Sequence, residues 1–321
     1  MFTVGVLIVM KISIITPMYN SEKYIGRMIQ ALKGLDYPKE DIEIIIIDNG
    51  SEDNSVNIVN KFGLSCLVMK GCSISKMRNA GAQIATGEIL GFVDSDCIVT
   101  RNWATVAREN IAGVGIVGGY YGLGESPGWI EKTWHDLKKD ITEDVSFVSA
   151  GNMVIKKSTF LELGGFDEDL ETGEDWELCQ RVINYGYRVV NQPELRVVHL
   201  GNHKTLIGII KKERWYGRGM FGALKGRFLS KPLLVSIIFL LLLVIGFSSI
   251  LITRFNMAII TLLLIVLIVL RTTYHFTLRV KTNRSLVFFK CIPITFCYLV
   301  GRSLSILDLM KMKILPNTLD G

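Results

Sequence analysis

The organisation of this chain centres on the sequence Gly91-Phe92-Val93-Asp94-Ser95-Asp96-Cys97. Its apolar part belongs to the run Ile89–Val93, which predicts a buried strand, and Asp94 and Asp96 follow where that strand ends. In an open α/β sheet, ligands bind outside the carboxyl ends of the strands. Side chains at positions i and i+2 of an extended segment point the same way. The two carboxylates can therefore bind one divalent cation that holds a diphosphate, although a turn or a helix cap has the same pattern.

Strand-like and helical patterns alternate before this sequence. Strands are expected at residues 11–16, 42–47, 64–69 and 88–93, and helices at residues 25–35, 54–62 and 73–85. The strand at 42–47 is almost wholly aliphatic, which is typical of a strand buried on both faces of a sheet. The alternation predicts an α/β domain with a Rossmann-like sheet.

The pattern is looser after Asp96. A helix is expected at residues 102–110 and a glycine-rich strand at 114–119. Residues 120–144 have no clear period and are interpreted as an irregular insertion of the kind that is usually functional or mobile. The remaining expected elements are a strand at 146–155, a short helix before Gly164, a helix from Glu174 to about Tyr185, and a strand at 195–198 that ends in His199.

Composition and charge indicate a membrane-associated protein. Of the 321 residues, 49% are hydrophobic, and the apolar excess follows Lys231. The formal net charge is +6, with basic residues concentrated at 204–231 and 271–284. Basic clusters beside apolar runs are typical of contact with an anionic membrane surface. No nucleic-acid-binding motif is present, and nucleic acid is not expected as a partner.

The C-terminal part is expected to form a membrane hairpin. Residues 204–231 are basic and amphipathic and predict an interfacial helix, with a soluble helix as the alternative. Leu233–Thr253 is uncharged and about one bilayer long. Arg254 is expected in a tight turn before a shorter apolar run, Phe255–Leu270, and lysines and arginines flank both ends of this hairpin, which predicts that both ends are cytoplasmic. Leu286–Leu307 is interpreted as an interfacial or re-entrant helix, with a third span as the alternative.

The cysteines and the N-terminus add two expectations. The six cysteines have no zinc-site spacing and are interpreted as buried apolar residues in a reducing compartment. Residues 1–10 have no basic region and no cleavage site, so they make a poor signal peptide. Translation can start at Met1 or at Met10.

Six short segments resemble, in their order, the family 2 glycosyltransferases of the GT-A fold. They are Thr16–Asn20, Ile47–Ser51, Met77–Gly81, Asp94–Asp96, Gly164–Glu168 and Glu174-Asp175. The resemblance covers about residues 11–200. It implies a mixed, mostly parallel sheet with flanking helices, and inverting transfer of a sugar from a nucleotide-diphosphate donor with Mg²⁺ or Mn²⁺.

The resemblance assigns the donor to the first strand ends. Pro17, Tyr19 and Asn20 would line the nucleotide, with the ring of Tyr19 packed on the base. Asp48 would accept a hydrogen bond from the base, and a turn-forming aspartate is the alternative. Arg78 would lie near the nucleotide and neutralise a carboxylate or a phosphate, and an ordinary ion pair is the alternative.

The same resemblance implies a metal site at the Asp-Ser-Asp segment. Asp96 would hold the metal, and Asp94 would reach the ribose or a metal-bound water. Ser95 lies between them on the donor side. His199 is similar to a position that often supplies a further metal ligand, although a lone histidine is often structural.

The acidic pair Glu174-Asp175 is expected to supply the general base, because a sugar hydroxyl is a poor nucleophile. Asp175 is the first choice and Glu174 the second. The alternative is an acidic first helical turn stabilised by the helix dipole. The acceptor side is expected to include Gly164, Gly165, Phe166 and Trp176.

The need for a base favours a hydroxyl acceptor, because a polyprenyl phosphate is already an anion. We therefore expect transfer from a nucleotide sugar, UDP-linked by the resemblance, to a hydroxyl of a membrane-associated or lipid-linked glycan. The alternatives are a polyprenyl-phosphate glycosyltransferase, an inactive nucleotide-binding membrane scaffold and a nucleotidyltransferase. Lys211 replaces the glutamine of the Gln-x-x-Arg-Trp motif of processive synthases, so processivity stays open.

The expected domains follow from these patterns. They are a catalytic domain at residues 1–203, a basic amphipathic helix at 204–231, a transmembrane hairpin at 232–274, and an interfacial helix with a cytoplasmic tail at 275–321. The chain is expected in the cell membrane, with about two spans and a cytoplasmic catalytic domain.

Overall fold

The computed structural model describes residues 10–137, 143–222, 231–278, 280 and 283–314. The chain divides into two compact units. Unit 1 comprises Met1–Gly124, Asp140–Leu170 and Glu174–Gly201, and unit 2 comprises Glu125–Lys139, Glu171–Gly173 and Asn202–Gly321. The signal-peptide interpretation concerns residues 1–10, of which 1–9 lie outside the described residues, as do 223–230 of the basic segment and 315–321 of the tail.

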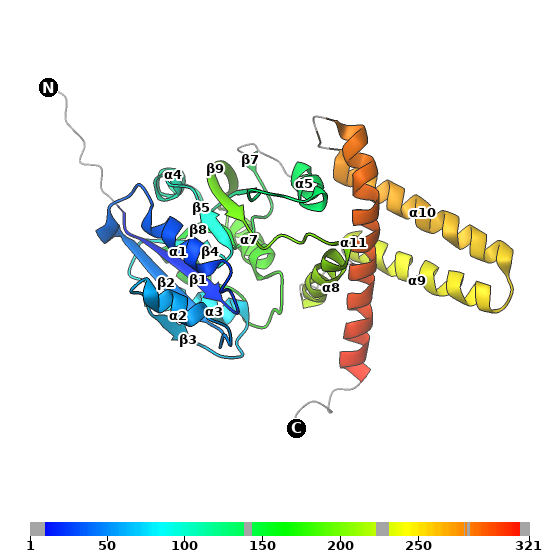
Figure 1. Ribbon diagram of the computed structural model, residues 1–321, viewed down its shortest axis with the longest axis horizontal. Helices are drawn as coiled ribbons and strands as arrows, with labels where there is room; N and C mark the ends of the chain where they lie inside the picture. The colour runs from blue at the N-terminus through cyan, green and yellow to red at the C-terminus, as the bar shows by residue number, and fades with distance from the viewer. Residues whose placement is uncertain (1–9, 138–142, 223–230, 279, 281–282, 315–321) are drawn as a thin grey trace. The chain divides into compact units, whose positions relative to one another are not determined.

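Unit 1 is built on one mixed sheet (Figure 1). Its strands are β1 (Ile12–Met18), β2 (Ile42–Asp48), β3 (Cys66–Val68), β4 (Ile89–Val93), β5 (Cys97–Val99), β6 (Ile116–Gly122), β7 (Glu143–Asp144), β8 (Asn152–Lys156) and β9 (Val189–His199). Among the described residues the order is β3-β2-β1-β4-β8-β6-β9-β5, with β7 paired to β9. The α/β architecture expected from the sequence is confirmed.

Helices connect and flank these strands. They are α1 (Ile25–Lys33), α2 (Ser55–Lys61), α3 (Ile74–Ile84), α4 (Trp103–Asn110), α6 (Lys157–Glu162) and α7 (Glu174–Asn184), with a 3₁₀ turn at Lys39–Asp41. Each of the four expected strands and three expected helices before Asp96 is present, with ends shifted by up to two residues. The strong hydrophobic periods of this half explain the agreement, because they depend little on distant contacts.

Parallel pairing holds the first half of the sheet, and antiparallel pairing enters with β8. β1 pairs in parallel with β2 and β4, so Met18 lies opposite Asp48 in the register. β8 is antiparallel to both β4 and β6, while β6 and β9 are parallel. The carboxyl ends of β1, β2 and β4 therefore meet at one edge, where the sequence places its polar segments.

Two apolar clusters cover the two faces of the sheet. Ile14 belongs to one cluster and its neighbour Ile15 to the other, because successive side chains of a strand point to opposite faces. Gly91 faces the buried ring of Trp103, and a Cβ at this glycine would lie 2.5 Å from that ring. The Trp103 indole N–H donates to the Asn152 side chain at 2.8 Å, which links α4 to β8.

Tertiary structure differs from the sequence-based expectation in three places of unit 1. The strand expected at 146–155 starts only at Asn152, because residues 148–151 form a loop and turn whose amide groups serve the site described below. The short strand β5 follows Asp96 directly, and β7 pairs with β9. The last strand is longer than expected and begins at Val189. The short strands β5 and β7 contain too few residues for a hydrophobic period to be visible in the sequence.

Unit 2 contains α5 (Trp129–Asp136), α8 (Leu206–Gly222), α9 (Lys231–Leu251), α10 (Phe255–Thr277) and α11 (Arg284–Ile314). The prediction of a wholly irregular 120–144 segment is wrong, because α5 lies within it. The buried Ile130 of α5 packs with Ile209, Ile294 and Cys297, so tertiary packing supplies the stability that its local sequence lacks.

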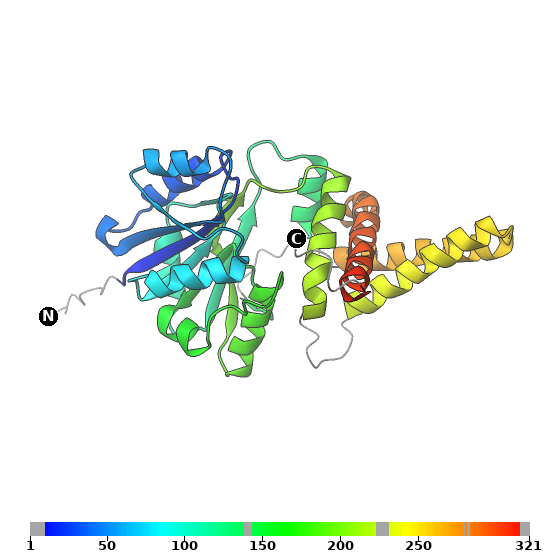
Figure 2. The same cartoon turned by 90° about the horizontal axis from the view of Figure 1, so that it is seen from below.

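Among the described residues, three helices of unit 2 are long and apolar enough to cross a membrane. They are Lys231–Leu251, Phe255–Thr277 and Arg284–Asp308. The turn expected at Arg254 is confirmed, because α9 ends before it and α10 begins after it (Figure 2). The second run is longer than expected, since its helix continues through Arg271 to Thr277. The helix at 284–308 satisfies the same length and hydropathy criteria. The expectation that the chain crosses the membrane about twice therefore stays a prediction.

The basic helix α8 packs along α11. Glu213 is buried and accepts from the Arg302 guanidinium at 2.7 Å, and Arg214 pairs with Asp308. At Gly217 a Cβ would lie 2.1 Å from the Ser305 hydroxyl, so glycine permits this close helix crossing. Part of the basic charge that the sequence attributes to a membrane contact is therefore neutralised within unit 2.

Candidate active site

The loops that follow β1 and β2 are joined by hydrogen bonds at the carboxyl edge of the sheet. Pro17 lies in β1, and Asn20 follows with a φ of +46°. The Asn20 amide donates to the Ser51 hydroxyl at 2.9 Å, and its side-chain oxygen accepts from the Glu52 amide at 2.9 Å. Tyr19, between these anchors, is 56% exposed. A rigid loop thus presents a free aromatic face, which suits packing on a nucleotide base.

Asp48 is buried at the end of β2 and holds its own turn. One carboxylate oxygen accepts from the amides of Gly50 and Ser51, each at 3.0 Å. The other oxygen accepts from the Ser51 hydroxyl. This geometry is the turn-forming alternative considered for Asp48. A carboxylate has about four lone-pair sites, so Asp48 can still accept a further hydrogen bond. Its role in binding the nucleotide base stays a prediction.

Arg78 lies on α3 with its guanidinium buried between two carboxylates. Nη1 donates to Glu174 Oε1 at 2.7 Å, and Nη2 donates to Asp94 Oδ1 at 2.8 Å. Burial alone would lower the pKa of Arg78, but the charges of Asp94 and Glu174 outweigh it and raise that pKa above its ordinary value. Arg78 therefore joins the β4 end to the start of α7.

Asp175 has an environment that differs from that of its neighbour Glu174. Its two oxygens accept from the backbone amides of Trp176 at 2.8 Å and Ala150 at 3.3 Å. Burial and the adjacent Glu174 charge raise the pKa of Asp175 to about 6, although Arg78 acts in the opposite direction. The Glu174 carboxylate is paired with Arg78, so the two neighbouring acids have different partners.

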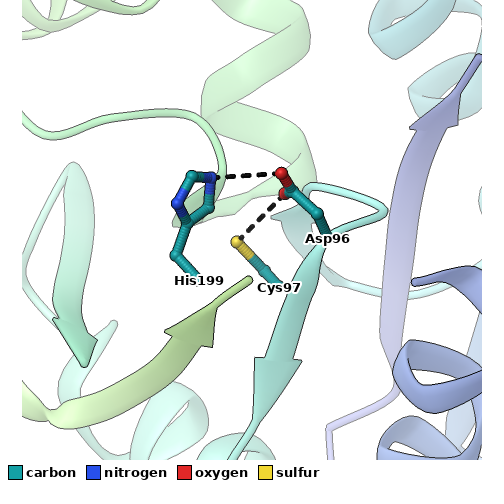
Figure 3. A group of neighbouring side chains, drawn as sticks. All are labelled: Asp96, Cys97 and His199. Carbon is teal, nitrogen blue, oxygen red and sulfur yellow. Dashed lines mark hydrogen bonds and ion pairs between the residues drawn. The ribbon is translucent and has the colours of Figure 1, made fainter. Parts of the chain in front are cut away.

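Asp96, in the middle of the unit-1 sequence, and His199, near its end, are brought together by the fold. His199 ends β9, and its Nε2 lies 3.3 Å from Asp96 Oδ2 (Figure 3). Antiparallel pairing of β5 with β9 sets Cys97 directly opposite His199. The Asp96 carbonyl also accepts from the Leu200 amide at 2.9 Å, which fixes the chain on both sides of the pair.

The donor set at this position fits a divalent cation. A carboxylate oxygen is a ligand that both Mg²⁺ and Mn²⁺ take, and an added imidazole nitrogen suits a transition metal such as Mn²⁺ better than Mg²⁺. The side chains of Asp96 and His199 keep 24% and 17% of their surface exposed, which leaves a route for an ion. Gly201 keeps this space open, because a Cβ there would lie 1.9 Å from Asp96 Oδ2.

Asp94 and Ser95 connect the metal-side residues to their neighbours. Asp94 faces Gly151, where a Cβ would lie 2.4 Å from Oδ2, so glycine is required for the carboxylate to take this position. The hydroxyls of Ser95 and Ser21 lie 2.7 Å apart, which ties the Asp-Ser-Asp segment to the loop after β1. The structure thus places the first-loop residues and the acidic segment side by side.

Tyr121 is a candidate site residue that sequence reasoning missed. It lies on β6, its hydroxyl donates to the Ser149 carbonyl at 3.3 Å, and its ring contacts that of His199 with centroids 6.0 Å apart. Burial, together with the nearby Cys97 and Asp94, raises the pKa of Tyr121 well above its ordinary value. The sequence gives only a weak indication of this residue, because Tyr121 is one of two tyrosines that directly follow Gly118 and Gly119 in the strand.

The Gly164–Phe166 segment is shaped by α3 as well as by its own glycines. Gly164 and Gly165 have φ values of +81° and +73°, a conformation that favours glycine. Asn79 donates to the Phe166 carbonyl at 2.8 Å and accepts from its amide at 2.9 Å. The Phe166 ring is buried against Phe92, whereas Trp176 is 40% exposed, so a contact of the Phe166 side chain with an acceptor is not supported and that of Trp176 stays a prediction.

Two family models match the chain. The model described as glycosyl transferase family 2 matches residues 13–163, and the model described as glycosyl transferase family group 2 matches residues 133–277. Together they extend over the sheet, the candidate site and the first two apolar helices.

Similar proteins include glycosyltransferases of archaea and bacteria. Glycosyltransferase AglE of Haloferax volcanii is 27% identical over 222 residues, which cover 65% of this chain and 72% of AglE. The pre-mycofactocin glycosyltransferase of Mycobacterium tuberculosis is 28% identical over 232 residues, which cover 64% of this chain but only 46% of that protein. The solved structure of the mannosyltransferase PcManGT from Pyrobaculum calidifontis, in complex with GDP-Man and Mn²⁺, has the same fold. Its TM-score is 0.57 at 14% identity, over 96% of this chain and 88% of that one.

Proposed function

Because the chain belongs to the family 2 glycosyltransferases, we propose that it transfers a sugar with inversion from a nucleotide-diphosphate donor to a hydroxyl of a membrane-associated glycan. The donor class we propose is UDP-linked, and the acceptor class is a lipid-linked or membrane-proximal glycan. The cofactor would be Mg²⁺ or Mn²⁺. The catalytic domain would face the cytoplasm.

One observation supports this proposal most directly. The carboxylate proposed as the base, Asp175, and the pair proposed to bind the metal, Asp96 and His199, lie next in the chain or close to residues that Arg78 joins. Arg78 joins Asp94 to Glu174, and Asp175 follows Glu174 directly. Asp96 comes two residues after Asp94 in the chain and lies 3.3 Å from His199. Transfer to a hydroxyl needs both functions, because the acceptor must lose a proton while charge grows on the leaving diphosphate.

The residues divide into donor, metal and acceptor functions. Tyr19 would pack on the base, with Pro17, Asn20 and Asp48 forming the walls of the nucleotide site. Asp96 and His199 would hold the cation, with Asp94 directed to the ribose or to a bound water. A divalent cation, when bound there, supplies charge that stabilises the leaving nucleoside diphosphate.

Asp175 would act on the acceptor. The acceptor oxygen attacks the anomeric carbon from the face opposite the diphosphate, its proton passes to the Asp175 carboxylate, and the electron pair of the broken bond leaves with the diphosphate. A base is most effective when its pKa lies near the working pH, and the raised pKa of about 6 suits this function. Inversion follows from a single displacement.

The apolar helices support a membrane-associated acceptor. Unit 2 carries three helices long and apolar enough to cross a bilayer, with Lys and Arg residues near their ends. An enzyme anchored in this way meets lipid-linked acceptors at high local concentration. Contact with an anionic membrane surface and a cytoplasmic site remain parts of the proposal.

The proposal is tested by a donor screen on the purified full chain. We expect one nucleotide sugar to release its nucleoside diphosphate in the presence of Mn²⁺ or Mg²⁺ and a membrane extract, and a chelator to stop this release. The Asp96→Ala variant should be inactive, whereas Asp36→Asn, which changes an exposed acid of unit 1 paired with Arg101, serves as the matched control.

Three outcomes would contradict the proposal or part of it. If no nucleotide sugar is bound or consumed by a folded chain, the inactive scaffold is correct. If the product releases its sugar in mild acid as a glycosyl phosphate, the acceptor is a polyprenyl phosphate. An α-linked product from an α-linked donor, seen by NMR of the anomeric proton, would exclude inversion.

A further inference from the structure

Cys97 is a sulfur donor placed beside the Asp96–His199 pair. Its thiol donates to Asp96 Oδ1 at 3.8 Å, and the residue is fully buried. The register of β5 and β9 sets Cys97 directly opposite His199, and residues paired in this way have their side chains on one face of the sheet. Figure 3 shows the sulfur and the imidazole directed to the same carboxylate.

The three ligand atoms have the spacing of a single metal site. One atom each from Asp96, Cys97 and His199 lie within 4.8 Å of one another. Ligands of one zinc ion are about 3–4 Å apart, because Zn–S is about 2.3 Å and Zn–N and Zn–O are about 2.0–2.2 Å. In this group Asp96 Oδ2 is 3.3 Å from His199 Nε2, which is already at such a separation.

The chemistry of the set differs from that of a magnesium site. Thiolate sulfur selects Zn²⁺ and other thiophilic metals, whereas Mg²⁺ and Mn²⁺ favour oxygen ligands. Three protein ligands with a fourth position open are the arrangement of zinc sites that also bind a small ligand. Asp96 and His199 alone would bind Mn²⁺. With Cys97 as a third ligand, the same position would bind a thiophilic cation.

We propose that Asp96, Cys97 and His199 form a three-ligand site for thiophilic divalent cations, Zn²⁺ and Co²⁺ in particular, in which Cys97 binds as a thiolate. The inference rests on the proposed function only in sharing Asp96 and His199 with it. Binding in this mode releases the thiol proton to solvent and places the metal at the pair that Mn²⁺ would otherwise use. Zn²⁺ therefore competes with Mn²⁺ at this position.

The test is cobalt binding to the full chain, read by absorption rather than by turnover. Co²⁺ bound to a thiolate gives a sulfur-to-cobalt charge-transfer band in the near ultraviolet. We expect the band in the wild-type chain and in Cys66→Ser, which removes a half-buried cysteine of unit 1 outside this group. Cys97→Ser should lack the band, and Asp96→Asn and His199→Ala should weaken it.

Zinc affinity gives a second readout. In Cys97→Ser, Zn²⁺ binding should weaken by at least the roughly 10- to 100-fold that losing even a supporting partner of a metal ligand costs. Mn²⁺ binding should weaken far less, so the ratio of the two affinities falls. Thermal unfolding of each variant shows whether it is folded.

The possible results separate this inference from the proposed function. A folded wild-type chain without the band, or a Cys97→Ser chain that keeps it, overturns the inference. A chain that gives the band and loses it in Cys97→Ser, yet consumes no nucleotide sugar, supports the ligand set and contradicts the proposed function. Turnover with Mn²⁺ in a chain that gives no cobalt band supports the proposed function and contradicts the three-ligand site.

Discussion

Arg78 Nη1 lies 2.7 Å from Glu174 Oε1, although the two residues are 96 positions apart in the chain. This contact joins the middle of α3 to the first turn of α7. Because Nη2 of the same guanidinium binds Asp94, the acidic segment after β4 and the acidic pair of α7 are held by one buried cation. The arrangement gives the two acids different partners: Glu174 pairs with Arg78, whereas Asp175 accepts from the backbone amides of Ala150 and Trp176.

Replacing Arg78 should cost stability. In Arg78→Met the Glu174 carboxylate is left buried without its partner, and loss of one member of a buried pair typically costs about 3–5 kcal/mol. The measurement is the thermal unfolding midpoint of the purified chain. Arg101→Met removes a pair with Asp36 on the exposed surface and is the control, for which we expect little change. Equal midpoints for both variants would contradict the structural function of Arg78.

Asp175 and Glu174 should respond differently to loss of charge. In Asp175→Asn we expect kcat to fall by about 10²- to 10⁴-fold, the usual contribution of a general base, with little change in the KM of the donor. Glu174→Gln keeps the base and should mainly lower the unfolding midpoint, because it weakens the Arg78 network. Steady-state kinetics of both variants decides the assignment. A fully active Asp175→Asn enzyme would falsify it.

The pH dependence of the reaction should report Asp175. Its pKa is raised to about 6, so kcat should rise with pH through this value and then level off as the carboxylate becomes charged. The free energy of unfolding should change in the opposite direction. The raised pKa of Asp175 stabilises the folded state at pH values below its ordinary pKa of 3.8, and this stabilisation is lost as the pH rises through about 6. Rate and unfolding profiles between pH 4 and pH 8 test both signs, and any residual activity of Asp175→Asn should lack the limb near pH 6.

Gly201 should matter for the metal position although it has no side chain. A Cβ there would lie 1.9 Å from Asp96 Oδ2, so Gly201→Ala must displace that carboxylate. A misplacement of about 1 Å can cost roughly 10²-fold in rate. The expected result is a higher Mn²⁺ requirement and lower activity without unfolding. Gly26→Ala, whose new Cβ would make ordinary contacts with Ile58 at 3.4 Å and Phe62 at 3.7 Å, is the matched control. Equal Mn²⁺ titrations for the two variants would contradict the argument.

Much of the first hundred residues could be predicted because their information is local. Aliphatic runs such as Ile42–Ile47 have no stable alternative to a buried strand, and the helices between them repeat their apolar residues every three or four positions. The polar segments that follow these strands could be recognised as candidate ligands for the same reason. The first two apolar helices of unit 2 also follow from length and composition, whereas the helix at 284–308, which meets the same criteria, is interpreted from the sequence as interfacial or re-entrant.

Local pattern could not predict the elements that depend on distant partners. Helix α5 gains its stability by packing Ile130 against residues of α8 and α11. The strand expected at 146–155 is interrupted by the turn at Ala150 and Gly151, since one amide serves Asp175 and the missing Cβ makes room for Asp94. Neither requirement is visible in the segment itself.

The order of residues along this chain determined which groups are available: the acidic segment, the acidic pair, a final-strand histidine and the apolar tail. Which of these groups contact one another was decided only in the folded chain. Arg78 binds Glu174 and leaves Asp175, and the register of β5 against β9 brings Cys97 opposite His199. The physical reason is that pKa values and ligand sets depend on distances between groups, and those distances come from strand pairing and burial rather than from spacing in the sequence.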